Sequence, residues 1–208
     1  MSTVQEGILE HTNRLPEGAL IAPKSFLHLG SRAAVDQALS RMARDGELLR
    51  ITRGWYVRPR PTRFGPRAPS SREVVEQLSR ATGETVVPSG AVAAHGLGLT
   101  TQVPVRTVYL TSGAGRRLQL GSQVVELRKA PSWQLWGAGT REGAVLRAVD
   151  WMGPEAGPEV VGRAVSSLTP EEKERLLLGC ASAPTWLAER LTRALFPDAT
   201  GVTTVRNG

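Results

Sequence analysis

The sequence predicts an α+β protein, with a three-helix unit closed by a β-hairpin at the N-terminus and an α+β domain ending in helices after it. Three observations lead to this fold class. Residues 31–59 carry an amphipathic helical pattern followed by two β-rich runs. Short β-rich runs bounded by turn residues recur over residues 85–127. Helical periodicity then occupies residues 141–196.

Composition places the chain among globular proteins, because 40% of its 208 residues are hydrophobic and 22% are charged. The single cysteine, Cys180, excludes an intramolecular disulfide and a cysteine-based zinc site, and we expect it to be a small core residue. The chain opens with polar residues, and no stretch approaches the ~20 apolar residues that span a bilayer. We therefore expect a cytoplasmic protein with no membrane partner.

The first two helices are predicted from their start signals. Thr3 and Glu6 have the spacing of a capping box, so the first helix should begin at once. Pro23 suits the first position of a short second helix. We expect that helix to turn Phe26 and Leu27 toward the core.

The third helix is predicted to begin at an N-cap, Ser31. At about 100° per residue, its apolar residues fall within roughly 60° of Val35 and form a stripe for a core. These residues are Val35, Ala38, Leu39 and Met42. The opposite side carries Ala33, Asp36, Gln37, Ser40, Arg41 and Arg44. Small, amide, hydroxyl and guanidinium groups of this kind suit base edges and phosphates in a DNA major groove.

Two β-rich runs follow, and the Arg53-Gly54 pair between them predicts a hairpin that also carries Arg50 and Arg58. Helices followed by such a hairpin are the arrangement of a winged helix-turn-helix, which we assign to residues 1–58. In that fold the third helix would read DNA and the hairpin would grip its backbone. The alternative is an ordinary solvated helix and hairpin.

Charge is unevenly distributed along the chain, whose net charge is +7. Residues 1–70 hold 11 Lys and Arg against 6 Asp and Glu, or +5, and the remainder holds 15 against 13, or +2. This excess is expected of a nucleic-acid surface, because charge that served solubility alone could have been spread evenly along the chain.

Residues 59–70 are rich in proline and arginine and are predicted to form an extended linker. Arginines at this exit, among them Arg58 and Arg60, could follow the DNA backbone or enter a minor groove. A soluble spacer is an equally good explanation.

Residues 71–197 are assigned to the C-terminal α+β domain, and residues 198–208 to a frayed tail. The predicted strands are 85–87, 105–110, 116–120 and 123–127. The predicted helices are 71–80, 91–95, 141–151, 159–168, 170–180 and 185–196. Trp133 and Trp136 flank a Pro-, Gly- and Ser-containing loop, and either anchor a protein contact or belong to the core.

No catalytic constellation can be assembled from the sequence. His11, His28 and His95 lack metal-ligand spacing with one another or with the cysteine. Ser89 and His95 have no third group to orient them as nucleophile and base. We therefore predict no catalytic residue, no metal and no cofactor, and a protein that is not an enzyme.

The segments FLHLGSRAAVDQALSRMARDGELLRITRGWYVRP and VVPSGAVAAHGLGLTTQVPVRTVYLTSG resemble the winged helix-turn-helix and the opening of the C-terminal domain of AbiEi-type antitoxins. The resemblance covers roughly residues 5–150. It implies a transcriptional autorepressor of a type IV toxin–antitoxin system that binds double-stranded DNA in its own promoter. It also implies opposition to a nucleotidyltransferase-like toxin, without necessarily a stable complex.

Carried onto this chain, the resemblance implies a DNA-binding surface of Lys24, Ser31, Arg32, Gln37, Ser40, Arg41, Arg44, Arg50 and Arg53. We expect the third helix to enter the major groove through Ala33, Gln37, Ser40 and Arg44, and the hairpin arginines and Lys24 to contact phosphates. Asp36 is unfavourable near DNA. It could accept a hydrogen bond from a cytosine amino group, but pairing with Arg32 is its expected role. Two alternatives stay open: a standalone winged-helix regulator without a toxin, and a protein-interaction module whose winged helix binds a partner.

Overall fold

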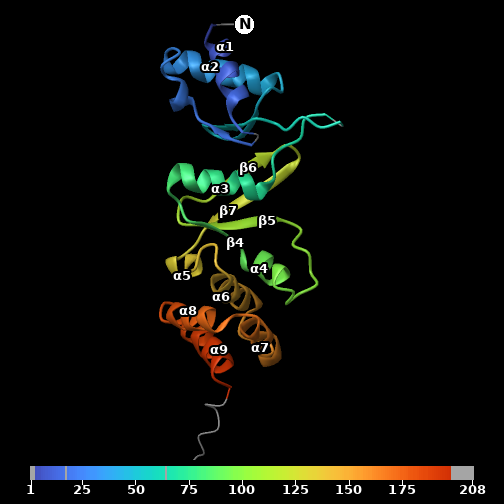
Figure 1. Cartoon of the computed structure of the whole chain (residues 1–208), viewed down its shortest axis with the longest axis vertical. Coiled ribbons are helices and arrows are strands. Elements are labelled where there is room, and N and C mark those ends of the chain that lie inside the picture. Colours follow the sequence, from blue (N-terminus) through green and yellow to red (C-terminus); the bar gives the residue numbers. More distant parts are fainter. Residues whose placement is uncertain (1–2, 17, 64, 198–208) are drawn as a thin grey trace, which may run out of the picture. The chain divides into compact units, whose positions relative to one another are not determined.

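The structure is a computed structural model that describes residues 3–16, 18–63 and 65–197. Over these residues the chain is α+β, with nine α-helices, one short 3-10 helix and two small sheets, and it ends in helices as predicted. It divides into two compact units, Met1–Glu84 with Gly115–Leu127, and Thr85–Ala114 with Arg128–Gly208 (Figure 1). The predicted tail, 198–208, lies outside the described residues.

The N-terminal part of the first unit is built from three helical segments and a three-stranded sheet of order β1-β3-β2. The segments are α1 (Thr3–Arg14), η1 (Pro23–Phe26), α2 (Arg32–Arg44), β1 (Leu20–Ile21), β2 (Leu49–Thr52) and β3 (Trp55–Val57). β3 pairs antiparallel with both neighbours. Their shared core contains Ile8, Ile21, Phe26, Val35, Leu39, Met42, Leu48 and Tyr56. The predicted helix order and hairpin are confirmed, whereas β1 was not predicted.

The second helical segment differs from its prediction in one side chain. Phe26 is buried as expected, and Pro23 is buried with it, but Leu27 is 47% exposed. The segment is a 3-10 helix, in which residues three apart share a face. Phe26 therefore follows Pro23 into the core, while Leu27 points outward and Leu29 packs against the core in its place.

The proline- and arginine-rich segment is folded back on itself rather than extended throughout. Arg60 and Arg67 exchange two backbone hydrogen bonds, of 2.7 and 2.8 Å. Within this loop Thr62 and Gly65 also bond to each other through their backbones. The loop ends at α3 (Ser71–Thr82), whose N-cap Ser70 forms a capping box with Glu73. A bond from the Ser70 hydroxyl lowers the pKa of the Glu73 carboxyl.

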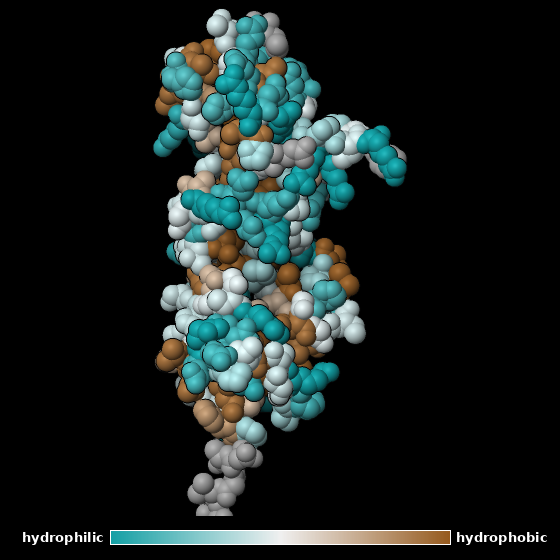
Figure 2. Space-filling view, viewed as in Figure 1, coloured by the Kyte–Doolittle hydropathy of each residue, from teal (hydrophilic) through white to brown (hydrophobic). Residues whose placement is uncertain are grey.

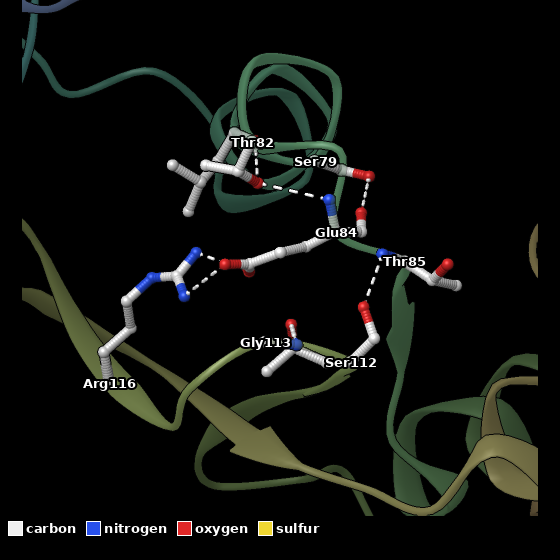
Figure 3. A network of polar contacts seen from close by, with 9 residues as sticks. Ser79, Thr82, Glu84, Thr85, Ser112, Gly113 and Arg116 are labelled. Carbon is white, nitrogen blue, oxygen red and sulfur yellow. Dashed lines mark hydrogen bonds and ion pairs between the residues drawn. The ribbon is translucent and has the colours of Figure 1, made fainter.

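Just after the end of α3, Glu84 forms an ion pair with Arg116 in the hairpin of β6 (Arg116–Leu120) and β7 (Gln123–Lys129) (Figure 3). Both guanidinium amino groups of Arg116 donate to the Glu84 carboxylate, at 3.0 and 2.7 Å. The Ser79 hydroxyl donates to the Glu84 carbonyl at 2.6 Å. Both side chains of the ion pair are 21% exposed, so water screens it less than a surface pair.

We expect Arg116→Ala to lower the free energy of unfolding by about 1–2 kcal/mol, because it leaves the Glu84 carboxylate partly buried without its bidentate partner. Urea unfolding of the full chain measures the change. The matched control is Arg117→Ala, which removes the same charge from an exposed position of the same strand. If the two variants unfold at the same urea concentration, the Arg116–Glu84 ion pair does not stabilise the fold.

The second unit combines two strands with most of the helices. These elements are β4 (Val86–Pro88), α4 (Gly90–Gly96), β5 (Thr107–Thr111), α5 (Ser132–Leu135), α6 (Arg141–Met152), α7 (Pro158–Ser166), α8 (Pro170–Cys180) and α9 (Thr185–Leu195). The helices predicted to begin at residues 141 and 170 do so, and the side chains of Thr140 and Thr169 cap them. Strand β5 begins two residues later than predicted, and Val105 is fully exposed. Pro104 precedes it and cannot donate to a strand ladder.

Trp133 and Trp136 belong to the core of the second unit, as one of the two predicted alternatives has it. Both are half-buried and pack against a cluster that includes Leu176 and Cys180. A Cβ on Gly179 would come within 2.7 Å of the Trp136 ring, so α8 passes close to that ring. Trp133 itself lies on α5, a short helix in a segment that was predicted to be a loop.

Arg147 is the most deeply buried cation of the described residues, at 2% exposure. Its Nη1 donates to the carbonyls of Gln134 and Trp136, at 3.2 and 3.0 Å, at the end of α5. Burial lowers the pKa of this guanidinium to about 10. Arg147 therefore holds the α5 segment against α6.

Candidate nucleic-acid interface

Helix α2 presents the polar face predicted from its sequence. Its N-cap Ser31 accepts a hydrogen bond from the Ala34 backbone N–H at 3.3 Å, which fixes the start of the helix. The helix ends at Arg44, and Gly46 follows with φ of 80°, a conformation that favours glycine. The predicted apolar stripe is buried along its whole length, so the opposite face is left toward solvent.

Most of the predicted interface residues lie at the surface. The exposed ones are Lys24, Ser31, Arg32, Ala33, Gln37, Arg41, Arg44, Arg50 and Arg53, and Ser40 is half-buried. Within the described part of the chain, five of these cations form no ion pair or hydrogen bond through their side chains. They are Lys24, Arg41, Arg44, Arg50 and Arg53. Their charge is therefore available to a ligand.

The β2–β3 hairpin carries Arg50 on a strand and Arg53 in the connection. Gly54 has φ of 75°, so the connection depends on a glycine in the left-handed region. The register is Leu49 with Val57 and Arg50 with Tyr56, and it shifts before Thr52 pairs with Trp55. The buried Ile51, Tyr56 and Val57 fix the hairpin to the core, while both arginines stay exposed.

Two predicted interface residues bind other parts of the first unit instead. Arg58 Nη1 donates to the backbone carbonyls of Thr12 and Asn13 at the end of α1, at 3.5 and 3.3 Å. Arg60 Nη2 pairs with Glu73 Oε1 at 2.7 Å. Both side chains were predicted to contact DNA, because carbonyls and carboxylates supplied by distant segments are not visible in local sequence.

The predicted Arg32–Asp36 pair is confirmed. Arg32 Nε donates to Asp36 Oδ2 at 2.9 Å, one helical turn along α2. The carboxylate that is unfavourable beside a polyanion is thereby compensated by a neighbouring cation.

In the described part of the chain, no group of three or more His, Cys, Asp or Glu side chains could hold a metal ion. None of the described helices is long and apolar enough to cross a membrane. A pocket of the first unit, lined by Arg60, Arg67, Ser70 and Gly121 among others, is polar. Arg60 and Ser70 already bind Glu73 there.

A family model matches residues 7–177 of this chain. The chain belongs to the family of unknown function DUF6088. A search of curated proteins found no match. Among solved structures, the chain is similar to the Rv2827c protein of Mycobacterium tuberculosis, with a TM-score of 0.55 and 15% sequence identity. The alignment covers 94% of this chain and 77% of that one. At this identity the likeness shows that a DUF6088 chain and the mycobacterial protein share a fold.

We expect Arg58→Ala to lower the free energy of unfolding by about 1 kcal/mol, because the last carbonyls of α1 lose a charged donor. A thermal melt measures the loss. The contrasting variant is Arg53→Ala, whose side chain is exposed and unpaired, and which should leave the melting temperature unchanged. If Arg58→Ala instead melts like the unmodified chain, the α1 contact carries no stability.

Proposed function

We propose that this protein is a DNA-binding transcriptional regulator and that its N-terminal part works as a winged helix-turn-helix. In this proposal α2 is the recognition helix and the β2–β3 hairpin is the wing. The observation that carries the proposal is the set of exposed, unpaired cations on these two elements and on η1, namely Lys24, Arg41, Arg44, Arg50 and Arg53. A surface of this kind attracts the phosphate backbone and releases its counterions.

The chemistry of α2 supports base reading as well as backbone attraction. Gln37 can make two-point contacts to adenine, and Arg44 to guanine, in the major groove. Ala33 and Ser40 are small enough to let the helix approach the base edges. The wing arginines Arg50 and Arg53, with Lys24, would contact phosphates and fix the register of the helix on the duplex.

We further propose that the regulated promoter is the protein's own and that the chain acts as the antitoxin of a type IV toxin–antitoxin system. This step is supported by the resemblance of residues 5–150 to AbiEi-type antitoxins. The opposing toxin would be nucleotidyltransferase-like and would be countered functionally rather than in a stable complex.

A protein-interaction role is the second candidate, and the surface of the second unit favours it. Apolar side chains are exposed there (Figure 2), with Val103 at 70%, Val105 at 100% and Leu178 at 72%. Isolated exposed apolar residues are common. Three apolar side chains that are each at least 70% exposed are nevertheless available for contact with a partner. In that case DNA binding would be weak and insensitive to salt. A standalone regulator without a toxin would still bind DNA. The presence or absence of a toxin gene beside this gene distinguishes an antitoxin from a standalone regulator.

We expect fluorescence anisotropy to show tight binding to the DNA upstream of the protein's own gene, with a steep salt dependence and a clear preference over scrambled DNA. Gln37→Ala and Arg44→Ala should each cost about 1–3 kcal/mol on the upstream DNA only. Arg53→Ala should weaken binding to both DNAs similarly and reduce the salt slope by about 1.

The control variant is Arg163→Ala, which removes one exposed arginine from α7 in the second unit and should leave both affinities unchanged. Equal losses on both DNAs for the Gln37 and Arg44 variants would contradict base reading by α2. Weak binding to both DNAs at low and high salt would contradict the DNA-binding function and favour a protein-interaction role for the second unit.

A further inference from the structure

Arg32 at the start of α2 forms an ion pair with Asp36, one turn further along, that helix stability does not explain. Arg32 occupies the first position of the helix and no acidic residue lies in its first turn. A cation at this end opposes the positive pole of the helix dipole. The pair with Asp36 is half-exposed, at 53% and 46%, and surface pairs of this kind contribute little to folding.

The geometry of the pair leaves the tip of the arginine free. Asp36 Oδ2 accepts from Nε, the nitrogen nearest the side-chain stem, at 2.9 Å. Within the described part of the chain, the terminal amino groups Nη1 and Nη2 of Arg32 form no hydrogen bond. A guanidinium held by Nε loses rotational freedom while presenting both amino groups end-on.

A guanine offers the matching pair of acceptors, because its N7 and O6 lie side by side in the major groove. A phosphate fits the pair less well. Arg32 and Asp36 together carry no net charge, so they add nothing to the attraction for the backbone, and the carboxylate is repelled by it. In helix-turn-helix proteins the N-terminal residues of the recognition helix contact base edges.

We propose that Arg32, held in place by Asp36, selects a guanine in the DNA site. Asp36 is then a positioning residue that determines specificity, and Arg32 is the residue that contacts the base. This inference rests on the proposed DNA-binding function, and it adds a base-reading pair to the groove contacts of Gln37 and Arg44.

The test is selection of binding sequences from a random duplex DNA library by the full chain and its variants. The unmodified protein should enrich a site with an invariant G·C pair that becomes degenerate with Arg32→Ala. Asp36→Ala should reduce the preference for that pair about tenfold, since an unheld arginine reads the base less well. Asp36→Glu, which can still reach Arg32 from the next turn, should restore the preference.

The matched control is Asp45→Ala, which removes the same negative charge from an exposed position at the other end of α2 and should leave the preference intact. Thermal melts of all variants exclude loss of folding. If Asp36→Ala raises affinity for every sequence equally and keeps the G·C preference, the positioning role is overturned. If Arg32→Ala leaves every position of the enriched site unchanged, guanine reading is overturned while DNA binding stands. If the unmodified protein enriches no sequence, the proposed function itself fails.

Discussion

Burial of one stripe of α2 is the constraint on which the candidate interface depends. Val35, Leu39 and Met42 are fully buried beneath the helix, and Phe26 of η1 packs into the same cluster. A helix whose apolar side is committed in this way cannot rotate without exposing that area to water. The outward direction of Gln37 and its neighbours is therefore set by the core and needs no ligand to hold it.

Arginine is used in two ways in the first unit, and the difference lies in what each guanidinium can reach. Arg58 reaches the last carbonyls of α1, and Arg116 reaches a carboxylate at the end of α3. Both therefore stabilise the fold. Arg44 and Arg53 find no such acceptor within the described residues and keep their charge for solvent or a ligand. Arg32 is intermediate, because one nitrogen is bound and its tip is free.

Local sequence signals were sufficient to predict most helices, because the residues that cap a helix are its neighbours in the sequence. The capping boxes at Ser70 and Thr169, and the N-cap at Ser31, each satisfy backbone donors with a side chain from the same turn. The errors fall where the geometry of a segment is set by the rest of the fold. Leu27 was expected inside, but the 3-10 geometry of η1 turns it outward. Strand β1 is two residues long and exists only because β3 pairs with it.

The α+β class, the apolar stripe of α2 and the cation-rich face opposite it follow from the sequence alone, because periodicity of 3.6 residues fixes which side chains share a face. The Arg32–Asp36 pair also followed from spacing, since residues four apart on a helix are neighbours. The tertiary structure was needed to show that Arg58 and Arg60 bind within the unit and that Trp136 packs against α8. Each of these contacts joins segments far apart in the chain, and a sequence pattern carries no distance between such segments.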